Sequence, residues 1–194
     1  HCTFSGRSCL IVSSASNTVV SGCYFYGSSD HFSIYYAGPS NLQAGKSTLD
    51  AYNNYKLDTS NIFYKNVVYA NYSGDSVSFS LQYLSQFVDN FIRGGKIAVY
   101  MCRTSNIYGN NIMDSTTNGI YISLPSDNLS VVGNKICDSK YSSIKIANQV
   151  EHGTFMSYNY NISILQNRIH NSFFYGIELN NCVNVNVLKN ILTS

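Results

Sequence analysis

The sequence predicts an all-β fold, a single-stranded parallel β-solenoid of about seven coils. A short asparagine-containing motif recurs along the chain, and residues that favour β-strands flank every copy. No stretch carries the apolar stripe of an amphipathic helix of useful length. Repetition at intervals of about 20 to 50 residues is typical of solenoids, in which each unit buries its apolar face against its neighbours.

Each motif places an asparagine three residues after one apolar β-former and two residues before another, as in FYKNVV at 63–68. The asparagines are Asn66, Asn90, Asn110, Asn134, Asn167 and Asn190. In an earlier copy, Gly22 takes the place of the asparagine. The steps from Gly22 onward are 44, 24, 20, 24, 33 and 23 residues, so a unit of about 20 to 24 residues repeats with two insertions.

A second element of each unit is a pair of apolar residues separated by one residue, about ten and twelve positions after the asparagine. The pairs are Leu10/Val12, Phe32/Ile34, Val77/Phe79, Ile97/Val99, Ile120/Ile122, Ile144/Ile146 and Ile177/Leu179. Alternation with period two indicates short strands with one buried face. Each unit therefore has three short strands, and coils stacked at about 4.8 Å share one apolar core.

The asparagines are expected to form a structural ladder. A side-chain amide both donates and accepts hydrogen bonds, so asparagines stacked in successive turns can satisfy one another and the backbone of the turn. Gly22 fits the same turn through its backbone freedom.

With these asparagines and the Gly-Ile-x-Ile-like strands at 119–122 and 176–179, the chain resembles the right-handed parallel β-helix family. This is the pectate-lyase-like superfamily, which also includes polygalacturonases, phage tailspikes and surface adhesin-like proteins. The resemblance covers nearly the whole chain. It implies the fold and a ligand groove on the outer face of the sheet formed by the apolar pairs, but no single activity, because one fold hosts several.

One domain, residues 1–194, is expected, as a segment of a longer solenoid. The register begins and ends partway through a coil, so we expect further coils or another protein at both ends, and a homo-trimer is a compatible assembly. The insertions at 37–60 and 147–160 are expected to be loops that overhang the ligand face. A degenerate extra coil within the first insertion is the alternative.

The composition favours a sugar partner over a nucleic acid. Charged residues make up 11% of the chain, the net charge is +2, and tyrosine occurs 17 times, whereas nucleic-acid binding needs clustered Lys and Arg. No apolar run is long enough to span a membrane. We expect an extracellular, cell-surface or virion location.

The six cysteines are expected to be free, mostly buried thiols, because Cys102 and Cys182 fall about 14 Å apart in the coil frame.

The candidate site follows from the outward positions of the apolar-pair strands. The predicted first row is Ile11, Ser33, Ser78, Ala98, Tyr121, Lys145 and Glu178, and the predicted second row is Ser13, Tyr35, Ser80, Tyr100, Ser123, Ala147 and Asn180. The predicted carbohydrate-binding residues are Tyr35, Tyr100, Tyr121, Lys145 and Glu178, because phenol rings stack on sugars and offer hydrogen bonds. An ordinary cross-strand ion pair between Lys145 and Glu178 is the structural alternative.

Catalysis has weaker support in the sequence. Glycoside hydrolysis needs two carboxylates, and the candidates are Glu178, Glu151 and Asp138, with Lys145 as a base for a lyase. The catalytic signatures of polygalacturonases and the calcium-binding aspartates of pectate lyases are absent, and we expect neither metal nor cofactor. The sequence thus predicts an adhesive or structural surface module that binds carbohydrate. The alternatives are a polysaccharide lyase or glycoside hydrolase, such as a phage depolymerase, and a spacer.

Overall fold

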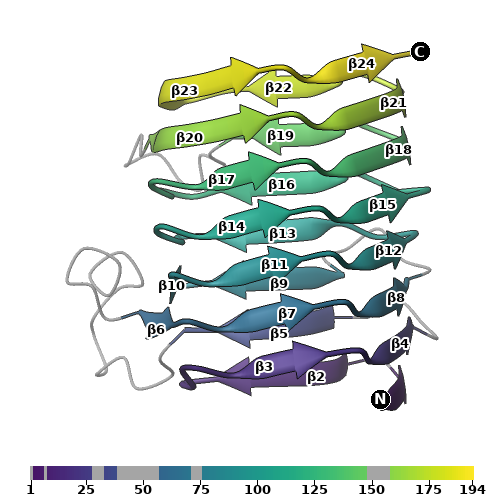
Figure 1. Ribbon diagram of the computed structural model, residues 1–194, viewed down its shortest axis with the longest axis vertical. Coiled ribbons are helices and arrows are strands. Elements are labelled where there is room, and N and C mark those ends of the chain that lie inside the picture. The colour runs from purple at the N-terminus through teal and green to yellow at the C-terminus, as the bar shows by residue number, and fades with distance from the viewer. Residues whose placement is uncertain (1, 7, 28–32, 39–56, 71–75, 148–157) are drawn as a thin grey trace, which may run out of the picture.

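The structure, a computed structural model, describes residues 2–6, 8–27, 33–38, 57–70, 76–147 and 158–194. It is an all-β parallel solenoid of about six turns, which confirms the predicted fold class. The chain coils in a right-handed sense, and every complete turn contributes one strand to each of three sheets that run along the rod (Figure 1). Within the described ranges, no helix is long and apolar enough to cross a membrane.

The three sheets are called A, B and C here. Sheet A contains β1 (Thr3–Gly6), β4 (Tyr24–Gly27), β8 (Val67–Tyr69), β12 (Phe91–Arg93), β15 (Asn111–Met113), β18 (Lys135–Ser139), β21 (Arg168–Ser172) and β24 (Ile191–Thr193). Sheet B contains β2 (Ser8–Ser13), β5 (Ser33–Ala37), β9 (Val77–Ser80), β13 (Ile97–Tyr100), β16 (Ile120–Ser123), β19 (Ile144–Ile146) and β22 (Ile177–Leu179). Sheet C contains β3 (Val19–Ser21), β7 (Ile62–Tyr64), β11 (Gln86–Val88), β14 (Asn106–Tyr108), β17 (Ser130–Val132), β20 (Asn159–Leu165) and β23 (Cys182–Leu188). A small sheet pairs β6 (Asp58–Thr59) with β10 (Gln82–Tyr83).

The number of turns is slightly lower than the predicted seven coils. The sequence motif marks seven corners, from Gly22 to Asn190, and seven corners enclose only six complete turns. The first insertion adds no turn between its neighbours, because β3 pairs directly with β7 and β5 pairs directly with β9. Most of both insertions, 39–56 and 148–157, lies outside the described residues.

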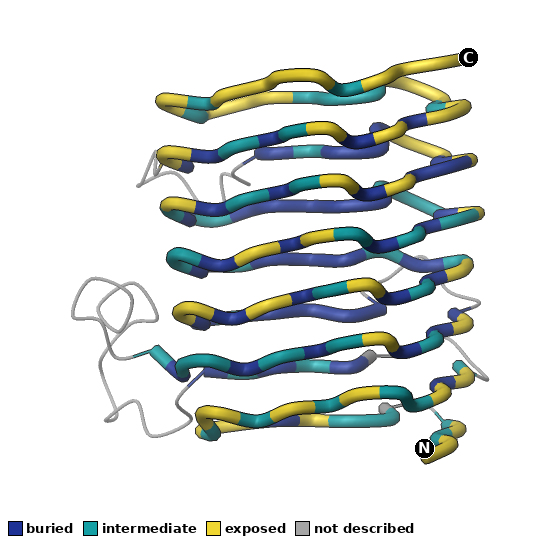
Figure 2. The backbone as a smooth tube through the Cα atoms, viewed as in Figure 1, coloured by how far each residue is buried: buried dark blue, intermediate teal, exposed yellow. Residues whose placement is uncertain are grey.

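The core is a column of side chains enclosed by the three sheets. Buried positions recur along successive turns of the backbone (Figure 2). The N-terminal half of the core is aromatic: the Phe63 and Phe87 rings lie 4.9 Å apart, and the Tyr36 ring meets Phe79 edge-on at 4.7 Å. Farther along the rod isoleucine and valine take over the same positions, for example Ile107 after Phe87. Identical or similar residues therefore stack at one level after another, and this explains the strict repetition of the apolar pattern.

The asparagine ladder is present at the corner between sheets C and A. From Asn66 to Asn167, each ladder side chain donates from Nδ2 to Oδ1 of the next at 2.9 to 3.3 Å, and the backbone N–H of each donates to the same oxygen. Asn66 to Asn167 are buried and Asn190 is half-buried. The residue before each ladder position has positive φ, as Gly109 does at 65° and Lys65 at 51°, so the chain turns sharply there.

The placement of Gly22 in the ladder was wrong by one residue. Val20 pairs with Phe63 and Tyr24 pairs with Val67, so Cys23 stands level with Asn66. Gly22, at φ 62°, instead takes the left-handed position that precedes the ladder. The Cys23 N–H donates to Asn66 Oδ1 at 2.9 Å, and this bond continues the backbone half of the ladder without an amide side chain.

A second polar ladder, which the sequence motif did not reveal, stabilises the corner where the chain enters sheet C. The Asn61 N–H donates to Ser85 Oγ at 3.2 Å, and the Ser85 N–H donates to Ser105 Oγ at 3.2 Å. All three residues are buried, so these bonds satisfy backbone donors that have left the sheet ladder. Serine hydroxyls at this corner therefore do what the asparagines do at the other.

Two smaller predictions also need correction. The buried pair of β5 is Ile34/Tyr36 rather than Phe32/Ile34, because Tyr35 pairs with Ile11 on one side and Ser78 on the other. Tyr35 therefore belongs to the first outward row. All six cysteines are free, but only Cys102 and Cys137 are buried, so "mostly buried" was wrong. Burial raises the pKa of the Cys102 thiol to about 12, which keeps it protonated.

Candidate functional site

The structure brings together four of the five predicted carbohydrate-binding residues on the outer face of sheet B. Tyr121, Lys145 and Glu178 are cross-strand neighbours in direct register on β16, β19 and β22. The ring of Tyr100 meets that of Tyr121 edge-on, with centroids 6.3 Å apart. Tyr35 lies apart from them, because Ser78 and Ala98 separate it from Tyr121 along the same row.

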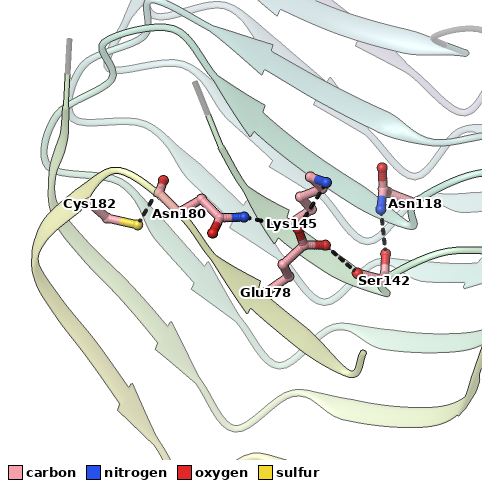
Figure 3. A network of polar contacts seen from close by, with 6 residues as sticks. All are labelled: Asn118, Ser142, Lys145, Glu178, Asn180 and Cys182. Carbon is pink, nitrogen blue, oxygen red and sulfur yellow. Dashed lines mark hydrogen bonds and ion pairs between the residues drawn. The ribbon is translucent and has the colours of Figure 1, made fainter. Parts of the chain in front are cut away.

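Lys145 and Glu178 form a closed polar network (Figure 3). Lys145 Nζ lies 2.9 Å from Glu178 Oε1, and Asn180 donates to the same oxygen at 2.9 Å. The Ser142 hydroxyl donates to Glu178 Oε2 at 2.6 Å, and the Ser142 carbonyl accepts from Asn118 at 2.8 Å. Both carboxylate oxygens are thus engaged within the protein, as expected for an ordered ion pair.

This network determines the protonation of Glu178. Burial would raise the pKa of the carboxyl, but hydrogen bonds from Ser142, Lys145 and Asn180 and the charge of Lys145 outweigh burial and lower it. A carboxyl with a lowered pKa holds no proton near neutral pH. It is therefore a poor general acid, and its engaged oxygens make it a poor base as well.

Tyr121 does not offer its ring face to a ligand. Its side chain points away from the core formed by Ile120 and Ile122, yet it is only 8% exposed. The ring is enclosed by its neighbours, with Tyr100 against one edge and Lys96 Nζ 5.4 Å from its centroid. The alternation of the strand predicted which way Tyr121 points, but not what packs over it.

The other described catalytic candidate, Asp138, is not part of the network around Glu178. Asp138 is in β18 of sheet A, where its Oδ1 accepts from Asn171 at 2.7 Å, and Glu151 lies outside the described residues. In the part of the chain that the structure describes, no three His, Cys, Asp or Glu side chains gather in a metal-binding arrangement.

A more open surface lies on the outer face of sheet C, the front of the rod in Figure 1. Two outward rows run along it. The apolar row is Tyr64, Val88, Tyr108, Val132, Leu165 and Leu188, and the mainly polar row is Ile62, Gln86, Asn106, Ser130, Ser163 and Asn186. Each row has one residue per coil, so a ligand lying along the rod would meet the same chemistry at each layer.

A groove of about 380 Å³ opens on this face across β11, β14 and β17. The apolar side chains that line it are Val88, Tyr108 and Val132, and Tyr108 is 51% exposed. We call this hollow the Tyr108 groove. It has the mixture of one aromatic surface, aliphatic walls and a few polar groups that is common in small-ligand sites.

The polar side chains of the Tyr108 groove are Gln86, Asn106 and Ser130. None of the three has a hydrogen-bond partner among the described residues, in contrast to the satisfied groups around Glu178. Two amides and a hydroxyl can both donate and accept, so they suit a ligand that does the same.

The sequence did carry a signal for this groove. The apolar outward row stands two residues before each ladder asparagine, within the motif, and the mainly polar row stands four residues before it, so both rows keep a fixed spacing from the ladder. The resemblance to known β-helices implies a ligand groove on sheet B instead.

Comparison of the sequence with protein-family models and with curated protein sequences finds no match in either.

Proposed function

We propose that this protein is a non-catalytic surface module of the pectate-lyase-like β-helix type that binds carbohydrate on the side of the rod. The binding surface is the Tyr108 groove, and the module acts outside the cell or on a virion as an adhesive or structural element. The observation that carries this proposal is the exposed Tyr108 ring beside polar side chains that lack partners within the described chain.

A saccharide fits this surface better than other small ligands. A sugar ring has an apolar face of C–H groups, which stacks on a phenol ring, and a rim of hydroxyls, which donate and accept. Gln86, Asn106 and Ser130 supply uncharged partners of both kinds. The absence of a charged group from the groove lining favours a neutral sugar unit at this position.

The alternative of a polysaccharide lyase or hydrolase has less support. Its best candidate, Glu178, is held by three side-chain hydrogen bonds and has a lowered pKa. Retaining and inverting hydrolysis both need a second carboxyl about 5 to 10 Å away. Asp138 is instead hydrogen-bonded to Asn171 on sheet A.

The test is binding of the full chain to a panel of immobilised and soluble oligosaccharides. For the best neutral ligand, Tyr108→Ala should weaken binding about tenfold or more, because an aromatic contact of this size is worth about 1 to 3 kcal/mol. Tyr141→Ala is the matched control, since Tyr141 has the same exposed fraction, 51%, but stacks on Phe174 away from the groove.

Two results would overturn the proposal. One is equal affinity of Tyr108→Ala, Tyr141→Ala and wild type for that ligand. The other is no binding of wild type to any saccharide, which would leave only the spacer. Release of reducing ends by wild type, abolished in Glu178→Gln with binding retained, would establish the enzyme alternative instead.

A further inference from the structure

We propose that the outer face of sheet A carries a separate oxyanion site, formed by Lys135, Arg168 and His170, that binds the carboxylate or sulfate group of an acidic saccharide chain. The class of ligand rests on the proposed carbohydrate function. The site itself rests on the geometry of three adjacent strands, β18, β21 and β24.

The register places the cationic groups side by side. Lys135 pairs with Arg168 across neighbouring strands, and both side chains are exposed. Two positions along, Cys137 pairs with His170 and His170 pairs with Thr193. Lys135, Arg168 and His170 therefore line one small patch, with a hollow of about 220 Å³ between them.

The two cations have no anionic partner in the described chain. Ion pairs between described residues join Arg93 to Asp114 and Lys145 to Glu178, and neither Lys135 nor Arg168 makes a side-chain hydrogen bond to a described residue. Like charges directly opposite each other on neighbouring strands destabilise a sheet. Folding alone does not explain this pair, whereas a bound anion between the two cations would relieve the repulsion.

The carboxylates that flank the patch are already engaged. Asp138 follows Cys137 in the chain and accepts from Asn171 at 2.7 Å, and Asp114 lies 2.6 Å from Arg93. They are therefore held by other partners at the corner next to sheet A and leave Lys135 and Arg168 free to attract an external anion.

The chemistry of the patch fits an oxyanion. Arg168 offers a planar fork of N–H donors, which matches carboxylate and sulfate oxygens, and Lys135 adds a second positive charge. The His170 ring uses Nδ1 toward Thr193 Oγ1 at 2.9 Å, so Nε2 remains without a partner among the described residues. The hollow is smaller than the Tyr108 groove, so it suits the charged substituent of a sugar rather than a whole ring.

The experiment uses the full chain and isothermal titration with four probes: a uronate oligosaccharide, its carboxyl-reduced neutral counterpart, a sulfated oligosaccharide and inorganic sulfate. Wild type should bind at least one acidic oligosaccharide about tenfold more tightly than the neutral one, and this preference should shrink as salt is raised. Arg168→Gln and Lys135→Gln should each remove most of the preference, whereas Lys140→Gln, the same change at another exposed position, should leave it unchanged.

The outcomes separate this site from the Tyr108 groove. If the neutral oligosaccharide binds and Tyr108→Ala abolishes that binding, but acidic and neutral probes bind equally, the groove stands and the oxyanion site is refuted. If the acidic preference depends on Arg168 while Tyr108→Ala affects no probe, the oxyanion site stands and the groove fails. Binding of inorganic sulfate alone, or equal losses in Arg168→Gln and Lys140→Gln, would also overturn the oxyanion site.

Discussion

Replacement of Asn134 by leucine tests the ladder at its centre, because this side chain bonds both neighbours. Its Oδ1 accepts from the N–H and from Nδ2 of Asn110, both at 3.0 Å, and its Nδ2 donates to Asn167 Oδ1 and to the Ile107 carbonyl, both at 3.0 Å. Leucine can make none of these bonds. The surroundings are buried, so water cannot readily replace them.

The cost can be estimated group by group. Asn110 Nδ2 keeps Phe87 and Tyr108 as acceptors, and Asn167 Oδ1 keeps the backbone N–H of residue 134. The Asn110 N–H, however, loses the acceptor it has in the ladder. We therefore expect Asn134→Leu to lower the free energy of unfolding by about 1 to 3 kcal/mol, the cost of an unsatisfied buried group.

Urea denaturation measures this effect. With a slope of about 2 kcal/mol per molar, the midpoint should fall by about 0.5 to 1.5 M. Asn106→Leu is the control, because Asn106 is exposed and its side chain has no bond to a described residue; that change should stay within about 0.5 kcal/mol. A midpoint for Asn134→Leu equal to that of wild type would refute the assignment of the ladder as a source of stability.

Asn190→Leu should cost less than Asn134→Leu in the same urea assay, since Asn190 is half-buried and water can take over its bonds; an equal or larger loss would contradict this. Gly133→Ala should cost about 1 kcal/mol of unfolding free energy, because φ is 63° there while the added Cβ would meet only Tyr108 Cε2 at 3.6 Å; no change would argue against backbone strain. Tyr121→Ala should lower the free energy of unfolding by about 3 kcal/mol, and with it the melting temperature, because the ring is buried; an exposed sugar platform would tolerate the change. Wild type should be more stable than Glu178→Gln by at most about 1 kcal/mol of unfolding free energy above about pH 5. Because the pKa of Glu178 is lowered in the folded protein, this difference should be lost as acidification protonates the carboxylate. A difference independent of pH would show that charge is not its source.

The solenoid could be predicted because its energetics repeat. Every coil must present an apolar residue to the same core column and a polar group at the same corner, so the pattern appears six times and errors in one copy do not hide it. The register of the ladder asparagines and of most sheet B strands followed directly from that pattern.

The errors fell where packing between coils decides the outcome. The first ladder copy was misplaced by one residue, because a glycine can occupy the left-handed position before the ladder as well as the ladder corner itself. The β5 pair was misplaced by two residues, which preserves the alternation, and only the aromatic core selects Tyr36. The burial of Tyr121 under Lys96 and Tyr100 depends on side chains from a neighbouring coil.

The most direct test of the central claim is an NMR titration of the isotope-labelled full chain with the neutral oligosaccharide that binds best. The proposal predicts that the largest shifts will fall on the Tyr108 groove, including the side-chain amides of Gln86 and Asn106, while Lys145 and Glu178 on sheet B stay unperturbed. Shifts centred on Tyr121 and Glu178, with the groove unchanged, would contradict it.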